Sequence, residues 1–251
     1  FDHFQISSTR AFDTIFKIRY QIIGNPLISI VIANKDHAGD LRRCLDSVFE
    51  KSTYDNFEVI IVENGSTEKS ILDYYEELKE NERVKIVTFE GPFNYSAVNN
   101  LGVSQAKGEY VLLLNNDTQV ITVNWMEDLL MSAQRPGVGA VGAKLYYGDK
   151  TIQHAGVVLG LGAHRTAGHS HYGQHRDNLG YMGRLCYAQN VSAVTGACLM
   201  VKKALFLQAG GLSEEFAVSL NDVDFCLKLR KMGLLNVFTP FAELYHFESL
   251  S

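Results

Sequence analysis

Acidic and amide side chains follow three separate apolar runs of this sequence, at the point where each run ends. Asn34-Lys35-Asp36 follows the first run, Glu63-Asn64 follows the second, and Asn115-Asn116-Asp117 follows the fourth. If these runs are strands of one parallel sheet, the polar groups share the edge at which such sheets bind ligands. Mg²⁺ and Mn²⁺ prefer oxygen ligands, and Mg²⁺ is commonly held by one or two carboxylates together with substrate phosphates. We therefore expect Asp117 to hold a hard cation.

Each of these groups also has a plain structural interpretation. Asn, Asp and Ser are common in turns and at helix N-termini, where their side chains bind backbone N–H groups. Asp222 lies near the start of a predicted helix and could simply complement the helix dipole. Asp224, two residues further on, faces a different side of that helix. Three polar groups at one edge, each on its own strand, are harder to explain as unrelated turns.

The elements that must position these residues alternate along the first half of the chain. Buried strands are predicted at 27–33, 57–62, 84–89 and 108–114. Helices are predicted between them, at 40–50, 70–81 and 95–106. This order predicts a doubly wound sheet with right-handed crossovers. In the second half, the pattern predicts strands at 137–147, 156–161, 191–201 and 236–238 and a helix at 221–232.

The composition narrows the kinds of molecule that the protein could bind. The formal net charge is −5, and the sequence lacks the clustered Lys and Arg that nucleic acid rewards. An anionic ligand would therefore need local cations, backbone donors or a metal ion. No apolar run reaches the roughly 18 residues of a membrane span. The four cysteines show no metal-type spacing, and we interpret them as buried thiols in a reducing compartment.

Two further features of the second half bear on a site. His164, His169, His171 and His175 lie in a Gly-rich stretch, 164–183, but their spacing matches no compact zinc pattern and no cysteine is close. We expect this stretch to form a mobile acceptor loop or lid rather than a zinc site. Thr195-Gly196 interrupts a predicted strand, which indicates either a bulge or a close approach of a ligand to the backbone.

The chain resembles the family 2 glycosyltransferases of the GT-A fold, particularly the bacterial rhamnosyltransferase-like branch. Six segments carry the resemblance in the family order and together span nearly all of residues 27–249. They are LISIVIANKD (27–36), VIIVENGSTE (59–68), FNYSAVNNLGVSQAKGEYVLLLNNDTQV (93–120), SAVTGACLMVKK (192–203), LNDVDFCLKLRKMG (220–233) and AELYHFES (242–249). No single segment is specific, but the ordered set is.

The resemblance implies a metal site at two residues and a catalytic role for a third. Asp117 matches the last carboxylate of the family's Asp-X-Asp metal motif, whose first position is Asn115 here. His246 matches a C-terminal histidine that completes the metal site or contacts the diphosphate in many members. Asp222 matches the carboxylate of the family's Glu-Asp motif, the general base that accepts the proton of the acceptor hydroxyl.

Contacts to the donor are also implied by position. Glu63 stands where the family often has an Asp that faces the nucleobase, and Asp36 lies near the nucleotide. Asn116 and Asp117 are expected to contact the donor. Thr195 and Gly196 are expected to contact the donor sugar or the acceptor. Gln153-His154-Ala155-Gly156 resembles a family element near the active site.

The implied fold is α/β: a GT-A (Rossmann-like) single domain with a mixed, mostly parallel central sheet flanked by helices. We expect an N-terminal lead-in at 1–26 and the GT-A domain at 27–251. Within it, 27–120 would bind the donor nucleotide and 121–251 would shape the acceptor site. Because the chain begins at Phe1 and ends soon after the last matching segment, we also expect it to be cut from a longer polypeptide.

The implied activity is that of an inverting, metal-dependent glycosyltransferase of the hexosyltransferase type. A UDP- or dTDP-sugar would be the donor, a saccharide or lipid-linked hydroxyl the acceptor, and Mg²⁺ or Mn²⁺ the cofactor. Direct attack inverts the anomeric centre and needs no protein nucleophile, and we find no nucleophile elbow. The expected setting is cell-surface polysaccharide synthesis in the cytoplasm, compatible with peripheral association at the inner face of the membrane and without a nucleic-acid partner.

Other classes fit less well. A dinucleotide oxidoreductase would carry a glycine fingerprint after the first strand, and a nucleotidyltransferase would carry a Gly-rich basic loop there. Residues 34–39 read NKDHAG and match neither pattern. A non-catalytic sugar- or partner-binding module of a larger protein stays open as the alternative, although the joint presence of Asp117, Asp222 and His246 speaks against decay of the site.

Overall fold

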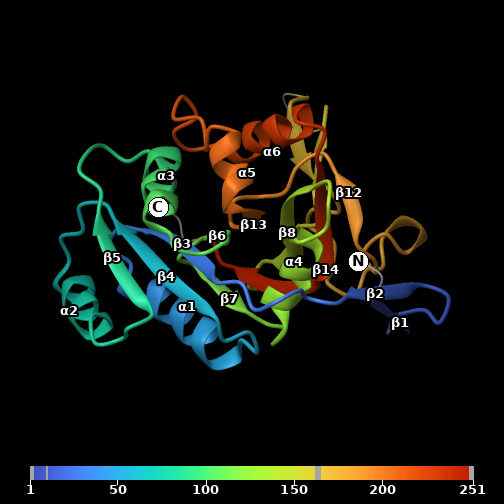
Figure 1. Ribbon diagram of the computed structural model, residues 1–251, viewed down its shortest axis with the longest axis horizontal. Helices are drawn as coiled ribbons and strands as arrows, with labels where there is room; N and C mark the ends of the chain where they lie inside the picture. The colour runs from blue at the N-terminus through green and yellow to red at the C-terminus, as the bar shows by residue number, and fades with distance from the viewer. Residues whose placement is uncertain (1–2, 10, 162–164, 249–251) are drawn as a thin grey trace.

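The central feature of the fold is a ten-stranded mixed sheet (Figure 1). The structure is a computed structural model, and it describes residues 3–9, 11–161 and 165–248. The strands of this sheet are β3 (Ile28–Asn34), β4 (Phe57–Glu63), β5 (Val84–Thr88), β6 (Tyr110–Leu114), β7 (Thr118–Val120), β8 (Val138–Tyr146), β9 (Ile152–His154), β12 (Gln189–Val191), β13 (Cys198–Lys202) and β14 (Leu235–His246). Their order is β12-β14-β8-β13-β6-β3-β4-β5, with β7 paired to β14 and β9 paired to β8.

Six α-helices flank the sheet in the described part of the chain. They are α1 (Ala38–Lys51), α2 (Lys69–Leu78), α3 (Tyr95–Gln105), α4 (Trp125–Ala133), α5 (Lys203–Gln208) and α6 (Asn221–Lys231). Apolar residues of α1, α2 and α4 pack in one buried cluster, and those of α3, α5 and α6 pack in a second cluster. Successive side chains of β3 divide between the clusters, since Ile30 and Ile32 belong to the first and Val31 to the second. The sheet is therefore covered on both faces.

The parallel part of the sheet confirms the prediction for the first half of the chain. Strands β6, β3, β4 and β5 pair in parallel, in that order. All four strands and all three helices expected between residues 27 and 114 are present, with ends shifted by three residues at most. Near-continuous burial of β3, β4 and β6 explains why their sequences are unbroken apolar runs.

The second half joins this sheet through β13, which runs antiparallel to both β6 and β8. The expected strand at 191–201 is wrong in its middle, because β12 ends at Val191 and β13 begins at Cys198. Residues 192–197 lie outside both strands, and the N–H groups of Thr195 and Gly196 bind side chains instead. The expected last strand at 236–238 is too short. It is the start of the 12-residue β14, whose end pairs with β7 and brings His246 opposite Thr118.

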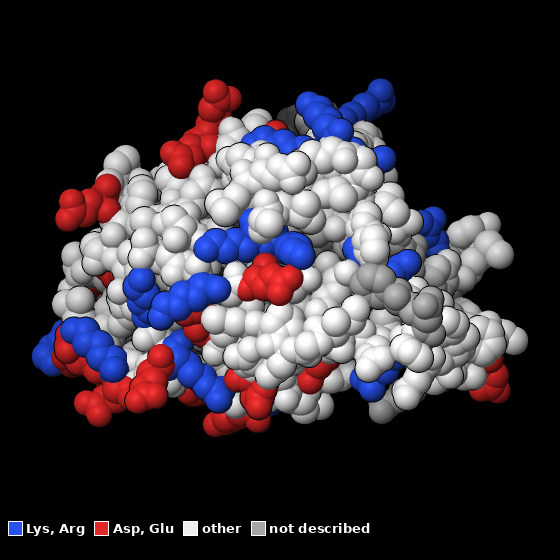
Figure 2. All heavy atoms as spheres, in the orientation of Figure 1, with Lys and Arg blue, Asp and Glu red and all other residues white. Residues whose placement is uncertain are grey.

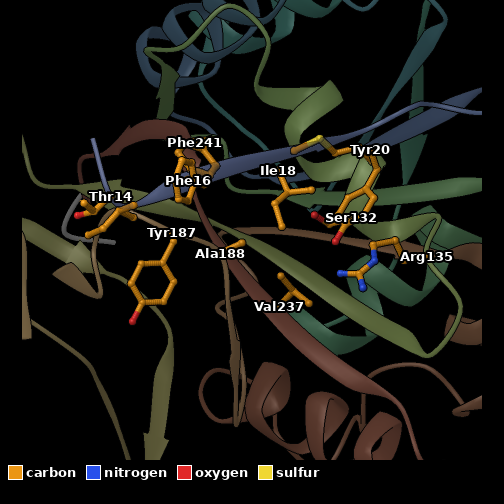
Figure 3. A pocket seen from close by; sticks show the side chains of 12 residues that line it. Thr14, Phe16, Ile18, Tyr20, Ser132, Arg135, Tyr187, Ala188, Val237 and Phe241 are labelled. Carbon is orange, nitrogen blue, oxygen red and sulfur yellow. The ribbon is translucent and has the colours of Figure 1, made fainter. Parts of the chain in front are cut away.

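The segment expected as a lead-in contains a hairpin, formed by β1 (Phe4–Ser8) and β2 (Phe16–Tyr20). Lys17 of β2 makes an ion pair of 2.7 Å with the buried carboxylate of Asp128 in α4, and its ammonium lies over the ring of Phe241. Arg135 stacks on the ring of Tyr20. A cavity of about 440 Å³ lies between the hairpin and β14, with Phe16 and Ile18 on one side and Val237 on the other (Figure 3).

Smaller elements complete the second half. The strands β10 (Val157–Leu159) and β11 (Ala167–His169) form a two-stranded antiparallel sheet, and a 3₁₀ helix, η1, spans Tyr181–Gly183. All four cysteines are buried and unbridged, which fits their interpretation as buried thiols, and burial raises the pKa of Cys44 to about 12. Across the described ranges, none of the helices has the length and apolar character needed to cross a bilayer.

Candidate active site

A cavity of about 530 Å³ opens at the carboxyl ends of β3, β4 and β6. The polar groups expected at this edge line it together, since Asn34, Asn64 and Asn115–Asp117 all contribute. Phe93 and Tyr95, before and at the start of α3, line the cavity as well, as does Val218. A ligand-sized cavity forms at this edge because the loops that follow neighbouring parallel strands separate from one another.

Two asparagines fix the floor of this cavity. The side-chain amide of Asn34 donates to the hydroxyl of Tyr75 at 2.8 Å, and its Oδ1 accepts from Nδ2 of Asn116 at 2.7 Å. Asn34 is buried, so these bonds satisfy a side chain that would otherwise be costly at the end of an apolar strand. Asn116 is therefore held in place from the neighbouring strand, and it lines the cavity beside Asp117.

Asp36 and Glu63 both accept hydrogen bonds from backbone groups. Oδ1 of Asp36 accepts from the N–H groups of Glu68 and Thr67, at 2.9 and 2.8 Å, just before α2 begins. The two bonds lower the pKa of Asp36 below its usual value, and the bond from Glu68 has the larger effect. Oε1 of Glu63 accepts from the N–H of Ser66. At least one oxygen of each carboxylate thus organises the loop around the cavity, and neither residue lines the cavity itself.

Asp117 lies against His246, which arrives from the far end of the chain on β14. The carboxylate Oδ1 is 3.1 Å from Nε2 of His246, and the two residues are only 7% and 9% exposed. On the other side of the ring, Nδ1 of His246 lies 2.6 Å from Oε1 of Gln153. An amide oxygen only accepts, so Nδ1 donates to Gln153 and Nε2 is the ring nitrogen that faces Asp117.

Nε2 of His246 faces both Asp117 and Asn115. It lies 3.1 Å from Oδ1 of Asp117 and 3.1 Å from the side-chain amide nitrogen of Asn115. A proton on Nε2 would make the contact with Asp117 an ion pair, and a cation bound at Oδ1 would take the place of that proton. A carboxylate suits Mg²⁺ and Mn²⁺, with the remaining positions left to water or phosphate.

Tyr95 connects the Asp117 side of the site with Asp222. Its hydroxyl lies 3.2 Å from Oδ1 of Asn115 and 3.1 Å from the carbonyl of Gly196. The N–H of Gly196 in turn donates to Oδ2 of Asp222 at 2.9 Å. Burial, followed by the charges of Asp222 and Asp117, raises the pKa of Tyr95, so its hydroxyl stays protonated. The charges of both carboxylates therefore act on the same hydroxyl.

Asp222 is a first-turn residue of α6 but not its N-cap, a position held by Leu220. Its Oδ1 accepts from the N–H of Val223 at 2.7 Å, while Oδ2 reaches across to Gly196. A Cβ on Gly196 would lie 3.0 Å from the Tyr95 hydroxyl and 3.6 Å from Cβ of Asp222, so the glycine permits this approach. Asp224 is engaged elsewhere, in an ion pair of 2.9 Å with Lys228.

The geometry also identifies residues that the motif reasoning did not assign. Tyr95 and Gln153 both touch the site, and His154 binds the loop at Thr195 through a 3.4 Å bond from that residue's N–H to Nε2. Gln153 and His154 belong to the four-residue element at 153–156, whose sequence signal was noted but carried no role. Tyr95 gave no signal, because a tyrosine at a helix start is ordinary in any sequence.

The histidine-rich stretch contains a short strand and lies against β9. The N–H of Ile152 donates to the carbonyl of Gln174 at 2.7 Å, and the N–H of Gly173 donates to the carbonyl of Ile152 at 2.8 Å. Across residues 3–9, 11–161 and 165–248, no three His, Cys, Asp or Glu side chains gather closely enough to hold a metal by themselves. His164, one of the four histidines considered for zinc, lies outside the described residues.

Charge around the site is local rather than broad. Figure 2 shows Lys and Arg mixed with Asp and Glu on the face drawn in Figure 1. Lys35 and His37, directly after β3, are the basic side chains that line the cavity within the described residues. An anionic ligand would therefore meet one ammonium group and the dipoles of backbone and amide groups, and would need a further cation beside Asp117.

Comparisons with known proteins bear on the family and on the fold. The family model for Glycosyl transferase family 2 matches residues 29–207. The uncharacterised protein y4gI of Sinorhizobium fredii is 47% identical over 94% of this chain and 26% of its own length. The O-antigen biosynthesis protein RfbC of Myxococcus xanthus is 38% identical over 94% of this chain and 18% of its own length. The chain thus spans about a quarter or less of these relatives.

A solved structure shares the fold at low sequence identity. The crystal structure of GalNAc-T7 with UDP, GalNAc and Mn²⁺ superposes with a TM-score of 0.70 and 15% identity, over 89% of this chain and 44% of that one. The expected GT-A architecture, a mixed central sheet flanked by helices, is therefore confirmed.

Proposed function

Since the chain belongs to glycosyl transferase family 2, we propose that it transfers a sugar from a nucleotide diphosphate-sugar to a hydroxyl acceptor, with inversion at the anomeric carbon. One observation carries the proposal. The Tyr95 hydroxyl links two parts of the site, since it contacts Asn115, which lies against His246 of the Asp117–His246 pair, and it contacts Gly196, whose N–H binds Asp222. A cation site and a proton acceptor side by side are what such a transfer needs.

Asp117 and His246 are the residues that would hold Mg²⁺ or Mn²⁺. The contact of 3.1 Å between the Asp117 carboxylate and Nε2 of His246 supports this assignment, and so does the Gln153 oxygen, which accepts from Nδ1 and so turns Nε2 towards Asp117. When bound, the cation offsets the negative charge that develops on the departing diphosphate. The GalNAc-T7 structure contains Mn²⁺ together with UDP. The fit supports a divalent ion in this chain as well.

Asp222 would act as the general base. Its Oδ2 is held by the Gly196 N–H, which fixes the direction in which its remaining lone pairs point. The acceptor hydroxyl would lose its proton to Asp222 as its oxygen attacks the anomeric carbon. The glycosidic bond forms while the bond to the diphosphate oxygen breaks, and attack from the face opposite the leaving group inverts the configuration.

The donor would lie in the cavity of about 530 Å³, with residues 27–120 as the nucleotide-binding half and 121–251 as the acceptor-binding half. Asn116 and Lys35 line this cavity and are the contacts best supported. Donor contacts from Asp36, Glu63, Thr195 and Gly196 are part of the same proposal. Of these, Asp36 and Glu63 would act through the loop that they hold, since each already accepts from backbone N–H groups.

The biological setting is proposed from the relatives. RfbC is named for O-antigen biosynthesis, which supports cell-surface polysaccharide synthesis with a saccharide or lipid-linked acceptor. The setting would be cytoplasmic, in agreement with four unbridged cysteines, with peripheral association at the inner face of the membrane. The much greater length of both relatives supports a GT-A domain, 27–251, within a longer polypeptide. Placement in the rhamnosyltransferase-like branch rests on the six quoted segments.

A thermal-shift screen tests the donor site. UDP, GDP and dTDP are each added with Mn²⁺ or with EDTA, and a ligand that binds the folded state raises Tm by mass action. We expect one nucleotide to raise Tm with Mn²⁺ and to do so far less with EDTA. Asp117→Ala should lose the difference between the two conditions. An Asp117→Ala variant that keeps the full Mn²⁺-dependent shift would remove Asp117 from the metal site.

Hydrolysis and transfer assays then separate catalysis from binding. UDP-glucose, UDP-galactose and dTDP-rhamnose are incubated with Mn²⁺, and release of the nucleotide diphosphate is measured with water or with octyl glycosides as acceptor. We expect release from the sugar nucleotide whose base gave the thermal shift. Binding without release from any matching donor would instead support a non-catalytic module.

A further inference from the structure

His154 is a fully buried histidine beside the site whose hydrogen bonds fix its tautomer. Its Nε2 accepts from the backbone N–H of Gly156 at 3.3 Å and lies 3.4 Å from the N–H of Thr195. Backbone N–H groups only donate, so Nε2 carries no proton. Burial lowers the pKa of His154 well below its usual value, which keeps the ring neutral. The one ring proton must therefore be on Nδ1.

The fixed tautomer of His154 determines that of His169. Nδ1 of His154 lies 2.8 Å from Nδ1 of His169, with the two rings nearly perpendicular at 82°. Because His154 donates from Nδ1, the Nδ1 atom of His169 must accept. Burial also lowers the pKa of His169, so its ring is neutral and its single proton is on Nε2. His169 is left with an N–H donor on the side of the ring away from His154.

The backbone places this pair beside Asp222. Two consecutive backbone N–H groups bind His154 and Asp222: the N–H of Thr195 donates to His154, and the N–H of Gly196 donates to Asp222. Besides burial, the charge of Asp222 is the largest influence on the pKa of His169. His169 is therefore connected to Asp222 through His154 and the Thr195-Gly196 backbone, and it is not part of the lining of the nucleotide cavity.

The strand that carries His169 is firmly held. His169 in β11 pairs with Val157 in β10, and the next residue, Ser170, binds the preceding turn twice. Its N–H donates to the carbonyl of Gly156 at 2.9 Å, and its hydroxyl donates to the carbonyl of Ala155 at 2.6 Å. Among the residues that the structure describes, none accepts a hydrogen bond from Nε2 of His169. A positioned donor without a protein acceptor is suited to a ligand oxygen.

We propose that His169 donates a hydrogen bond from Nε2 to a hydroxyl oxygen of the acceptor saccharide, and that His154 is the positioning residue that fixes its tautomer. The proposal rests on the function proposed above and extends it to recognition of the acceptor. It assigns a role to the element at 153–156, where Gln153 orients His246 on the metal side and His154 orients His169 on the acceptor side.

The tautomers can be observed without substrate. Long-range ¹H–¹⁵N correlation spectra of the ¹⁵N-histidine-labelled chain distinguish protonated from unprotonated ring nitrogens. We expect His154 to be protonated at Nδ1 and His169 at Nε2, with assignments made from His154→Gln and His169→Gln. A His154 ring protonated at Nε2, or a His169 ring protonated at Nδ1, would overturn the arrangement.

A matched pair of variants tests the contact to the acceptor. The amide nitrogen of Gln can occupy the place of Nε2 in His169, whereas that of Asn reaches only the place of Nδ1. With an octyl glycoside acceptor, His169→Asn should raise the acceptor KM about tenfold, the value of one lost hydrogen bond, and His169→Gln should raise it no more than about threefold. Donor hydrolysis in water should be unchanged in both variants, because water needs no such contact.

The possible failures are distinct. If the wild-type chain transfers sugar and folded His169→Asn has the same acceptor KM, the proposal for His169 is wrong and the proposed function stands. If both variants lose donor hydrolysis as well, His169 acts on the donor or on folding, and the proposal is again wrong. If the wild-type chain neither hydrolyses nor transfers from any donor, the proposed function falls, while the spectra still decide whether His154 sets the tautomer.

Discussion

At the scale of single residues, the site holds two carboxylates in different surroundings. Asp117 lies 3.1 Å from Nε2 of His246, the residue with which we propose that it holds a cation. Asp222 is bound by two backbone N–H groups and has no basic side chain among its hydrogen-bond partners in the described residues. The two bonds fix the orientation of the carboxylate. These different surroundings fit the two roles that we propose, metal ligand for Asp117 and general base for Asp222.

Replacing the base should abolish chemistry without affecting donor binding. Asp222→Asn keeps one oxygen that can accept from the Gly196 N–H and loses only the acceptor for the adjacent Val223 N–H, so the contact between α6 and Gly196 should persist. We expect kcat to fall by about 10²–10⁴-fold, the usual contribution of general-base catalysis. Donor affinity, measured by calorimetry with Mn²⁺, should change by less than about twofold, since no proton acceptor is needed for binding.

The neighbouring acid is the matched control for this variant. Asp224→Asn removes a carboxylate two residues away, which is paired with Lys228 rather than with Gly196. Its kcat should stay within about threefold of wild type. If Asp224→Asn were the slower enzyme of the two, Asp222 would not be the base.

Gln153 is expected to control metal affinity without touching the metal. Its oxygen accepts the Nδ1 proton of His246 and so leaves Nε2 free for a ligand bond. Gln153→Leu removes that acceptor and should weaken Mn²⁺ binding by about 10–100-fold, as is usual for partners of metal-ligating histidines. Binding is measured by calorimetry in the presence of the nucleotide.

Gln153→Glu provides the comparison, because it keeps an acceptor oxygen at the same place. It should bind Mn²⁺ more tightly than Gln153→Leu. Equal affinity in wild type and Gln153→Leu would show that the orientation of His246 does not depend on Gln153.

At the scale of elements, the close packing of α3 against the sheet positions the start of this helix beside the cavity. Gly102, in the middle of α3, lies over β3 and β4, and a Cβ there would come within 2.3 Å of Cγ1 of Val31 and 2.9 Å of Cγ2 of Val62. Both valines are fully buried in central strands and cannot move aside. The absence of a side chain at Gly102 therefore sets how near α3, and Tyr95 at its start, lie to the strand ends.

Adding one methyl group at this position should push α3 away from the sheet. Gly102→Ala should lower the free energy of unfolding by about 1–3 kcal/mol, the usual cost of overpacking. The measurement is equilibrium unfolding in urea. Because Tyr95 moves with the helix, kcat should fall as well.

Gly39 in α1 is the control for helix propensity. A Cβ at Gly39 meets nothing within 4 Å. Gly39→Ala should therefore raise the free energy of unfolding by up to about 1 kcal/mol, since alanine restricts the unfolded chain more than glycine does. If both alanine variants were stabilised, α3 would not be in tight contact with the sheet.

At the scale of the whole molecule, one ion pair fastens the N-terminal hairpin to the domain. Asp128 is almost fully buried in α4, and its carboxylate is paired with Lys17 of β2 at 2.7 Å and with the Asn124 amide at 2.8 Å. Burial lowers the pKa of Lys17, because removing the ammonium from water costs free energy. The pair is therefore a strong constraint on the position of the hairpin, since either partner alone would be a poorly solvated charge.

Removing one partner should be worse than removing both charges. Lys17→Met should lower the free energy of unfolding by about 3–5 kcal/mol, the usual cost of leaving a buried charge without its partner. The double variant Lys17→Met with Asp128→Asn should recover part of that loss, because the remaining amide is neutral. Urea unfolding of the four members of the cycle measures the coupling. Additive effects in the cycle would mean that the hairpin is held by its apolar contacts alone.

The sequence by itself determined the parallel half of the sheet and the edge where the polar groups gather. Each buried strand is a local apolar run, and a residue that follows such a run must emerge at the strand's carboxyl end. Asn34, Asn64 and Asp117 could therefore be assigned to one edge from the sequence alone. The segment resemblance added His246 and Asp222 as partners, although it could not give their contacts.

The tertiary structure alone decided which groups meet. Asn115 and His246 are 131 residues apart, and Gln153 and His246 are 93 apart, and both pairs meet because β14 returns between β7 and β8. The hairpin at the N-terminus and the break at 192–197 were also beyond the sequence pattern. Local periodicity records whether a residue is buried. It does not record the strand order that brings distant residues together, because that order follows from how all the apolar faces pack at once.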